Sequence, residues 1–376
     1  DVYSKLNNYD EAIGHYNKAI EIKPDYAEAY SNLGASFVNL HKYQEASETY
    51  KKTILLKPNY ADTYSDFGLT LFELEQREKA IYYYRKSIRI RPGNREVHYN
   101  LGMALKEIGR YEEAITHYDL VDDRNSIALS LECLYLAKQY DKFNSRLKSV
   151  IAKNDKNIRV AAVSAFVANQ LKREDPYPFC KNPLNFIHIG TLDNYTNDTD
   201  KFIDNIISEA EKEKLVWQPR KKATRHGFQT FSGIFKAGNT CSILESFIKN
   251  ELDVYYSKFS KKDCIFIKYW PHEYKLEGWY VRLMQNGYQE AHIHPNGWIS
   301  GVVYLKPIVG TNSNDGALEL SLHGHNLPIL NEKFPKTTHN AKKGDIIIFP
   351  SSVFHKTIPF KENSQRCVIA FDVVPR

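Results

Sequence analysis

The segment Glu290-Ala-His-Ile-His-Pro-Asn-Gly-Trp-Ile-Ser-Gly-Val-Val-Tyr-Leu305 joins two histidines to a run of β-branched and aromatic residues. Residues two apart in an extended segment lie on the same face. His292 and His294 can therefore point into one cavity, and Ser300 and Tyr304 share an inward face in the strand that follows. The segment predicts a strand at the mouth of a β-barrel, with two imidazoles at its edge.

A second segment, Gly344-Asp-Ile-Ile-Ile-Phe-Pro-Ser-Ser-Val-Phe-His355, ends a hydrophobic strand with another histidine, and Arg366 begins the next strand. Neutral imidazole is the commonest protein ligand of divalent transition metals. Arginine offers a planar, doubly donating cation to a carboxylate, and the Tyr304 hydroxyl could donate to the same group. A His-x-His pair alone is common, but this whole combination predicts a metal site that contains His292 and His355.

Short strand-like runs fill most of the C-terminal half, after one helical stretch at about 200–214. They are rich in β-branched and aromatic residues and are separated by Gly, Pro and Asn turns. Several short strands in a row, without helices between them, predict an all-β sandwich or barrel. The runs are Cys264–Tyr269, Gly278–Met284, Trp298–Leu305, Ala317–Ser321, Asp345–Phe349 and Arg366–Val373.

The first third of the chain repeats with a period of 34 residues. Such a period marks a repeat architecture in which each unit is one helix pair. Small residues let the two helices approach closely, aromatic residues fill the remaining space, and proline ends the pair. The recurring residues are Pro24, Pro58 and Pro92; Ala12, Ala46, Ala80 and Ala114; Gly34, Gly68 and Gly102; and Tyr16, Tyr50, Tyr84 and Tyr118.

This register closely resembles the tetratricopeptide (TPR) repeat over residues 1–120, with a truncated first repeat. Residues 121–174 keep a helical pattern without the period, and we expect them to be degenerate capping helices. The resemblance implies a concave groove that binds a protein or peptide partner. Asn32, Asp66 and Asn100 share one register and could point into that groove, or could be solvated helix positions. The repeats could also be a spacer or a dimer contact.

The composition of the chain argues against nucleic-acid binding, a disulfide framework and a membrane span. Lys+Arg (51) and Asp+Glu (45) are intermixed and leave a net charge of +6, which does not indicate nucleic-acid binding. The five cysteines form no CxxC pair, which favours a reducing, cytoplasmic setting. The sequence contains no apolar run of about 18 residues, so we expect no membrane span. The chain begins within a repeat, so we expect a fragment, and the sequence leaves the oligomeric state open.

From the proline-rich stretch at 175–183 onward, the chain resembles the 2-oxoglutarate/Fe(II) oxygenase superfamily of the His-x-His-Pro type. The matching residues are Trp279, His292 to Pro295, Ser300-Gly301, Tyr304, Gly344, Phe349-Pro350, His355 and Arg366. The resemblance implies a double-stranded β-helix over 175–376, and hence an α + β multidomain chain behind an all-α TPR solenoid. It implies the cofactors Fe(II), 2-oxoglutarate and O2, and a dioxygenase that hydroxylates a protein, peptide or small molecule while converting 2-oxoglutarate to succinate.

By the same resemblance, His292 is the first metal ligand and His355 the last, Arg366 binds 2-oxoglutarate, and Tyr304 assists it. The chain departs from the family pattern at His294, which stands where the family has a carboxylate. His294 therefore either completes a three-histidine site or leaves the third position to water.

Further residues are weaker candidates. Ser300 and Arg282 could help to bind the cosubstrate. Arg225 lies in a stretch, 225–230, that reads as a loop over the pocket, and Arg225, Gln285 and Trp298 are candidate substrate contacts. A second His-x-His pair, His323 and His325, lies in a turn-rich segment that favours a loop.

Two alternative functions fit the same residues. A cupin shares the double-stranded β-helix and binds metal through histidines. Cupins usually place a glutamate three or four residues after His-x-His, where this chain has Trp298 and Ile299. A TPR scaffold with an inactive barrel is the other alternative, and the presence of His355 and Arg366 argues against it.

Overall fold

The computed structural model describes residues 9–153, 156–219, 222–308, 314–324 and 327–376. His325 lies outside these residues. The chain forms two compact units that divide between Phe143 and Asn144.

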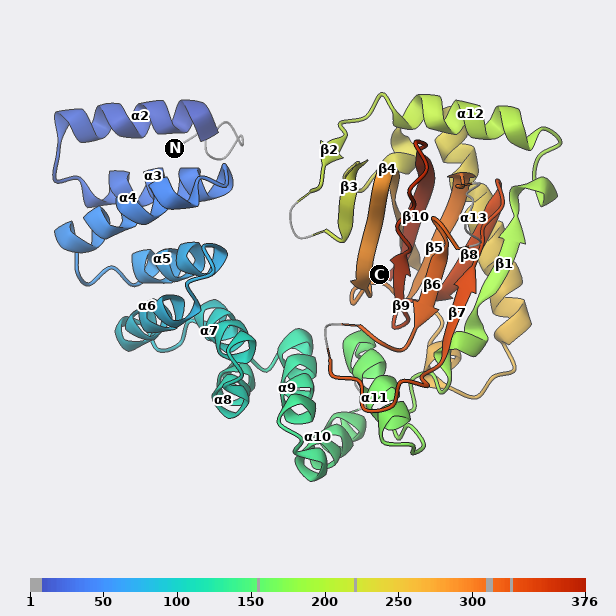
Figure 1. Cartoon of the computed structure of the whole chain (residues 1–376), viewed down its shortest axis with the longest axis horizontal. Helices are drawn as coiled ribbons and strands as arrows, with labels where there is room; N and C mark the ends of the chain where they lie inside the picture. Colours follow the sequence, from blue (N-terminus) through green and yellow to red (C-terminus); the bar gives the residue numbers. More distant parts are fainter. Residues whose placement is uncertain (1–8, 154–155, 220–221, 309–313, 325–326) are drawn as a thin grey trace. The chain divides into compact units, whose positions relative to one another are not determined.

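The N-terminal unit is a succession of helices joined by short connections (Figure 1). Helices that are adjacent in the chain pack on one another, and the short connections make the neighbours antiparallel. The prediction of a TPR-like helical array is confirmed. The helices are α2 (Tyr9–Ile22), α3 (Ala27–Asn39), α4 (Tyr43–Leu56), α5 (Ala61–Glu73), α6 (Arg77–Ile90), α7 (Arg95–Glu107), α8 (Tyr111–Val121) and α9 (Arg124–Leu136).

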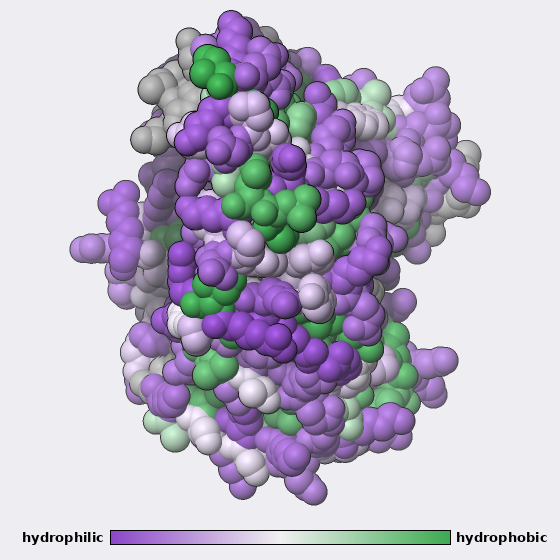
Figure 2. All heavy atoms as spheres, turned by 90° about the vertical axis from the view of Figure 1, so that its left-hand side faces the viewer, coloured by the Kyte–Doolittle hydropathy of each residue, from purple (hydrophilic) through white to green (hydrophobic). Residues whose placement is uncertain are grey.

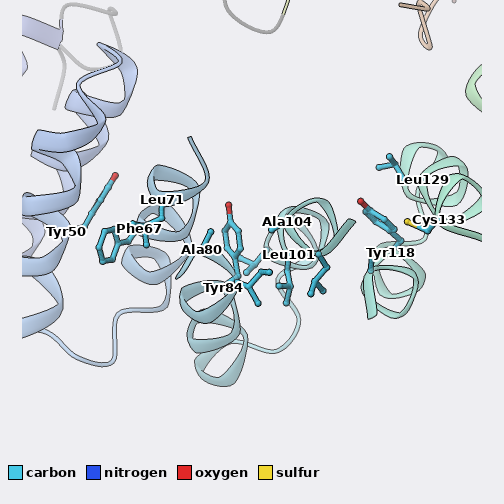
Figure 3. Packing of buried hydrophobic residues seen from close by; sticks show 14 of the residues in the cluster. Tyr50, Phe67, Leu71, Ala80, Tyr84, Leu101, Ala104, Tyr118, Leu129 and Cys133 are labelled. Carbon is cyan, nitrogen blue, oxygen red and sulfur yellow. The ribbon is translucent and has the colours of Figure 1, made fainter. Parts of the chain in front are cut away.

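The repeated glycines and tyrosines form one recurring contact. A Cβ atom placed on Gly68 would lie 2.7 Å from the Tyr84 ring, and Gly34 and Gly102 face Tyr50 and Tyr118 in the same way. In each helix pair, the tyrosine ring of the second helix therefore occupies the space that a side chain in place of the glycine would fill. Figure 3 shows these tyrosines in the buried core that runs along the unit.

The surface of this unit is mainly hydrophilic. Figure 2 shows small, separated groups of hydrophobic side chains on the face that it presents, rather than one continuous patch. Large exposed hydrophobic residues of the unit include Ile22 and Leu55, at 86% and 76% exposure. Scattered single residues of this kind are normal on a folded surface.

The C-terminal unit is built on an antiparallel sheet that curls into a half-barrel (Figure 1). The strand order is β1-β8-β5-β10-β4-β9-β6-β7, and β3 joins β4 and carries β2. The strands are β1 (His188–Thr191), β2 (Val216–Trp217), β3 (Thr224–Gln229), β4 (Tyr274–His292), β5 (Ile299–Lys306), β6 (Leu318–Ser321), β7 (Lys336–His339), β8 (Asp345–Pro350), β9 (Phe354–Thr357) and β10 (Arg366–Pro375).

The long strand β4 links two layers of this sheet. Its first part pairs with β10, which leads on to β5, β8 and β1. Its last residues pair with β9, which leads on to β6 and β7. Buried side chains of both layers form one core. This arrangement is the predicted jelly-roll or double-stranded β-helix.

Several local predictions were wrong. Cys264–Tyr269, expected as a strand, forms the short helix α14 (Ile265–Lys268), because the Ile265 and Phe266 amides donate to the carbonyls of Pro178 and Phe179. The run of strands is also interrupted by α13 (Asn239–Phe259), a 21-residue helix. Residues 225–230, expected as a loop, belong mostly to β3.

The expected helix near 200–214 is α12 (Thr199–Ala210), which contacts β5, while α13 contacts β8. Short 3-10 helices η1 (Pro183–Phe186), η2 (Leu192–Asn194) and η3 (Ile234–Lys236) connect the elements around this side of the sheet. None of the helices in the described ranges combines the length and hydrophobicity of a membrane span.

Helix α11 (Ile158–Gln170) is part of the C-terminal unit, whereas α10 (Tyr140–Ala152) contains the division between the units. The Gln170 side-chain carbonyl accepts hydrogen bonds from the amides of Leu330 and Asn331, at 2.7 and 2.9 Å. Ala162 packs with Ile293 and Phe354 in a small buried cluster. Helix α11 therefore packs against the residues beside the predicted metal ligands.

Candidate metal centre

Three histidines converge at the end of β4. His292 is the last residue of β4 and pairs directly with His355 on β9, while His294 follows in the turn after β4. The potential ligand nitrogens of the three residues all lie within 4.8 Å of one another. The structure thus brings together the histidines that the sequence singled out, in an arrangement that could hold one metal ion.

The strand geometry explains why these side chains meet. The pairing of β4 with β9 is irregular between Gln289 and His292, where β4 contains one extra residue relative to its partner. Such a bulge lets residues three apart face the same side. Gln289 and His292 accordingly both line one cavity.

Backbone carbonyls orient two of the rings. The His292 Nδ1 lies 2.7 Å from the carbonyl of Glu290, and the His355 Nδ1 lies 3.1 Å from that of Val353. A nitrogen that faces a carbonyl carries the proton, so the lone pair of each ring lies on Nε2. A backbone partner of this kind fixes the tautomer of metal-binding histidines.

Asp372 on β10 orients the third ring. The His294 Nδ1 lies 2.7 and 2.6 Å from the two carboxylate oxygens of Asp372. The Ser300 hydroxyl donates to the same carboxylate at 2.7 Å and lies 2.8 Å from the Ser351 hydroxyl. A Cβ atom on Gly297 would lie 2.8 Å from Ser351 Oγ, so glycine leaves room for this network. The network fixes His294 with its Nε2 available to a metal.

Burial keeps His355 neutral. The loss of solvation lowers the pKa of His355 well below its ordinary value, and the electrostatic effect of the neighbouring His292 and His294 lowers it further. Metal ligands of this type bind as neutral imidazole, so this environment suits coordination.

Arg366 and Tyr304 form a buried pair between the two layers. Arg366 is 1% exposed, its Nη2 donates to the Tyr304 hydroxyl at 2.9 Å, and its Nε donates to the Gly316 carbonyl at 3.0 Å. Burial raises the pKa of Tyr304, although the guanidinium opposes this shift, and the phenol stays neutral. Among the described residues, no partner reaches Arg366 Nη1. A buried guanidinium with an unused donor fits a carboxylate ligand.

A cavity of about 470 Å³ opens in front of the histidines. His292, His294 and Asp372 form part of its wall. Trp279 stacks on the His294 ring, with centroids 5.4 Å apart. The remaining lining is a mixture of amides, hydroxyls, aromatic groups and single charges, including Gln229, Gln289, Thr230, Ser232, Phe231, Asn296, Lys222 and Glu277. This composition suits an uncharged polar or aromatic group better than a strongly charged one.

Two predicted residues do not join this group. Arg282 alternates with Leu283 on β4 and lies on the other face of the sheet, where it donates to Glu211 at 2.8 Å. Trp298 is 5% exposed, and its indole nitrogen donates to the Phe266 carbonyl within an aromatic cluster. Neither residue therefore belongs to the proposed site.

The other candidates lie at the margin or away from it. Arg225 bonds the Lys222 carbonyl and the Glu290 carboxylate, and so holds a segment that lines the cavity. Gln285 is exposed and donates to the Lys361 carbonyl. The His323 ring bonds the Leu327 carbonyl, as expected for a loop residue rather than a ligand.

Asp372 was missed in the sequence, although a signal was present. It is the only acidic residue in the apolar strand β10 and lies six positions after Arg366, on the same face by alternation. Thr357 was also missed in the sequence; it lies two residues after His355 on β9 and so on the same face of the strand.

Comparison with known families agrees with this geometry. Residues 277–372 match the family described as "Putative 2OG-Fe(II) oxygenase". Two TPR models match residues 1–41 and 68–109, and residues 27–60 and 96–127. The chain therefore carries N-terminal TPR repeats and a C-terminal domain of the 2-oxoglutarate/Fe(II) oxygenase family.

Among solved structures, the chain is similar to MamA, with 20% identity and a TM-score of 0.39, over 42% of this chain and 94% of that one. YrrB, described as a TPR protein with an unusual peptide-binding site, shows 23% identity and a TM-score of 0.37 over 40% and 80% of the two chains. PilF of Pseudomonas aeruginosa shows 18% identity and a TM-score of 0.36 over 43% and 75%. No curated protein sequence matches the chain.

Proposed function

We propose that the C-terminal domain is an Fe(II)- and 2-oxoglutarate-dependent dioxygenase that hydroxylates a substrate held in the 470 Å³ cavity. The observation that carries the proposal is the pairing of a three-histidine cluster with the buried Arg366, whose Nη1 has no partner among the described residues. A metal and a dicarboxylate would satisfy both features at once. The family match supports the same class of reaction.

His294 is proposed as the third metal ligand. Three neutral imidazoles supply one negative charge less than the usual two-His-one-carboxylate set. The Asp372 carboxylate behind His294 compensates for part of this deficit, because a carboxylate bonded to Nδ1 makes the ring a stronger donor. The family pattern has a carboxylate that binds the metal directly. In this chain the carboxylate of Asp372 would act on the metal through the His294 ring.

Other residues of the chain would bind 2-oxoglutarate and orient the substrate. Fe(II), when bound with 2-oxoglutarate and O2, supplies the oxidation of a C–H bond. Arg366 and Tyr304 would hold the far carboxylate of 2-oxoglutarate by charge-assisted hydrogen bonds. Trp279 and Gln289 would orient the substrate in front of the histidines, in a cavity that excludes part of the bulk water.

The purified chain, loaded anaerobically with Fe(II), tests this function. We expect 2-oxoglutarate to bind by calorimetry and succinate to appear slowly on exposure to oxygen, even without substrate. Arg366→Ala should raise the dissociation constant for 2-oxoglutarate at least tenfold, since loss of a buried charge partner costs about 2–5 kcal/mol. A metal-loaded protein that binds no 2-oxoglutarate would contradict the proposal and favour a cupin-like enzyme.

The TPR repeats point to a partner protein, and we propose that they deliver a protein or peptide substrate. A small-molecule substrate, with a partner protein bound elsewhere, is the alternative. Mass spectrometry of proteins captured by the chain would separate the two, because a substrate protein gains one oxygen only when Fe(II) and 2-oxoglutarate are present.

A further inference from the structure

Thr357 lies on the same strand and face as the buried metal ligand His355. The two residues are separated on β9 only by Lys356, whose ammonium bonds the Glu319 carboxylate at 3.0 Å. Side chains alternate along a strand, so Thr357 points to the side on which the histidines meet. At 1% exposure, it is as deeply buried as Arg366.

The strand partners of Thr357 show where its side chain lies. Thr357 lies directly opposite Leu318 on β6 and Gln289 on β4. Leu318 belongs to the core between the layers, together with Tyr304, and Gln289 lines the cavity in front of the histidines. Directly opposed residues share a face, so the Thr357 side chain lies between the cavity and the interior that holds Tyr304.

Backbone bonds connect the same region to Arg366. Gly316 accepts a hydrogen bond from Arg366 Nε at 3.0 Å, and its own amide donates to the carbonyl of Ile358 at 3.1 Å. Ile358 is the residue after Thr357. Thr357 therefore lies between the metal-site residue His355 and Ile358, whose carbonyl bonds the same glycine that Arg366 bonds.

Two buried donors in this interior are unused. Within the described residues, neither the Thr357 hydroxyl nor Arg366 Nη1 has a hydrogen-bond partner. A buried polar group without a partner is costly to the folded protein. A carboxylate accepts up to about four hydrogen bonds, so one dicarboxylate ligand could satisfy both groups.

We propose that Thr357 is a cosubstrate-binding residue whose hydroxyl donates to a carboxylate of 2-oxoglutarate. The proposal rests on the proposed function and adds a residue to it. It gives Thr357 a role different from strand packing, because a β-branched residue that only packed would be served equally well by valine.

Substitution of the hydroxyl by a methyl group tests the proposal. In the full chain loaded with Mn(II), Thr357→Val should raise the dissociation constant for 2-oxoglutarate about tenfold, as expected for loss of a hydrogen bond to a charged group. Thr357→Ser, which keeps the hydroxyl, should stay within about threefold of the unmodified chain. Without cosubstrate, Thr357→Val should bind Mn(II) normally and unfold at the same temperature or a higher one, since an unsatisfied group has been removed.

The outcomes separate this proposal from the proposed function. Unchanged 2-oxoglutarate affinity in Thr357→Val, while Arg366→Ala binds poorly, would overturn the role of Thr357 and leave the function standing. A cosubstrate-free Thr357→Val protein with a lower unfolding temperature and weakened Mn(II) binding would show a structural role instead. If the unmodified chain binds no 2-oxoglutarate, the proposed function fails first and this inference fails with it.

Discussion

The His294 ring is held by both carboxylate oxygens of Asp372, at 2.7 and 2.6 Å from Nδ1. Both side chains are 13% exposed. This contact joins the turn after β4 to the middle of β10 and directs the other nitrogen of His294 toward His292 and His355. The residue that departs from the family pattern is thus hydrogen-bonded to a carboxylate, and in the proposed three-histidine site this carboxylate would compensate for part of the missing charge.

Asp372→Asn should weaken metal binding about 10- to 100-fold, since residues that orient a metal ligand have effects of this size. The amide keeps the shape of the carboxylate but loses its charge. Titration of the apo protein with Fe(II) or Co(II) under anaerobic conditions measures the change. Asp345→Asn is a matched control, because Asp345 bonds His339 at 2.9 Å in the same sheet and belongs to no metal cluster found in the described residues. Equal affinities for the two variants would contradict the role of Asp372.

His294→Ala should weaken Fe(II) binding about as much as His292→Ala does, because each change removes one of three ligands. Each loss should be at least as large as that of Asp372→Asn, which removes only an orienting group. His323→Ala is the control, since His323 also comes from a His-x-His pair but bonds a backbone carbonyl. An unaltered Fe(II) affinity for His294→Ala would assign the third position to water and leave His292 and His355 in place.

The packing of helix α11 within the C-terminal unit predicts an effect on metal binding. Ala162 is 3% exposed and packs with Ile293, which lies between the two histidines, and with Phe354, which precedes His355. Ala162→Leu overpacks this contact, at a cost of about 1–3 kcal/mol, and should displace its neighbours. We expect a lower unfolding temperature together with weaker metal binding in calorimetry.

The matched control for Ala162→Leu is Ala104→Leu in the helical unit, where Ala104 is fully buried. It should destabilise that unit to a similar extent and leave the metal affinity unchanged. If Ala162→Leu also binds metal normally, α11 covers the sheet without positioning the ligands.

The repeats and the histidine pair could be predicted because their signals are local. A period of 34 residues and the alternation of His292 and His294 are visible within single segments. The Asp372 contact depends on which strands pair, and β10 lies between β5 and β4, far from its order in the sequence. No spacing rule gives that pairing, so Asp372 could be singled out as the one acidic residue of β10, but its contact with His294 could not be predicted.

The errors in secondary structure have physical causes. The buried residues of α13, among them Leu244, Ile248, Leu252 and Tyr255, recur every three or four positions, a helical period that the many aromatic residues obscured. Cys264–Tyr269 has strand-like composition, but packing of Phe266 in the aromatic cluster and the bonds to 178–179 select a helical turn. Tertiary contacts there override local preference.

The glycine–tyrosine contact of the repeats predicts that replacing the glycine by alanine lowers the stability of the helical unit. Gly68→Ala would place a methyl group 2.7 Å from the ring of Tyr84, which is 1% exposed and has little room to move. We expect a net loss of about 1–2 kcal/mol, because overpacking exceeds the gain of about 1 kcal/mol in helix propensity. Urea denaturation followed by circular dichroism measures it. Gly93→Ala, with nothing within 4 Å of the new atom, should change stability by less than about 0.5 kcal/mol, and equal losses in both variants would contradict the contact.

Asp66 predicts a pH dependence of the helical unit. Burial raises the pKa of Asp66 from 3.8 to about 6, and the negative charges of Asp62 and Glu96 add to the shift. The folded state therefore binds a proton more tightly than the unfolded state. This contribution to stability is fully present below about pH 4 and is lost as the pH rises through 6.

Asp66→Asn removes the charge that is costly at high pH. Relative to the unmodified chain, the variant should be more stable by about 1–2 kcal/mol at pH 8, after allowance for solvent that reaches the side chain, and the difference should shrink toward pH 4. Urea denaturation at pH 4, 6 and 8 measures the trend. The control is Asp10→Asn, which replaces an exposed carboxylate of α2 and so relieves no buried charge; it should give no gain in stability at pH 8. A stability difference for Asp66→Asn that stays constant from pH 4 to pH 8 would mean that the carboxylate is as well solvated in the fold as in the unfolded chain.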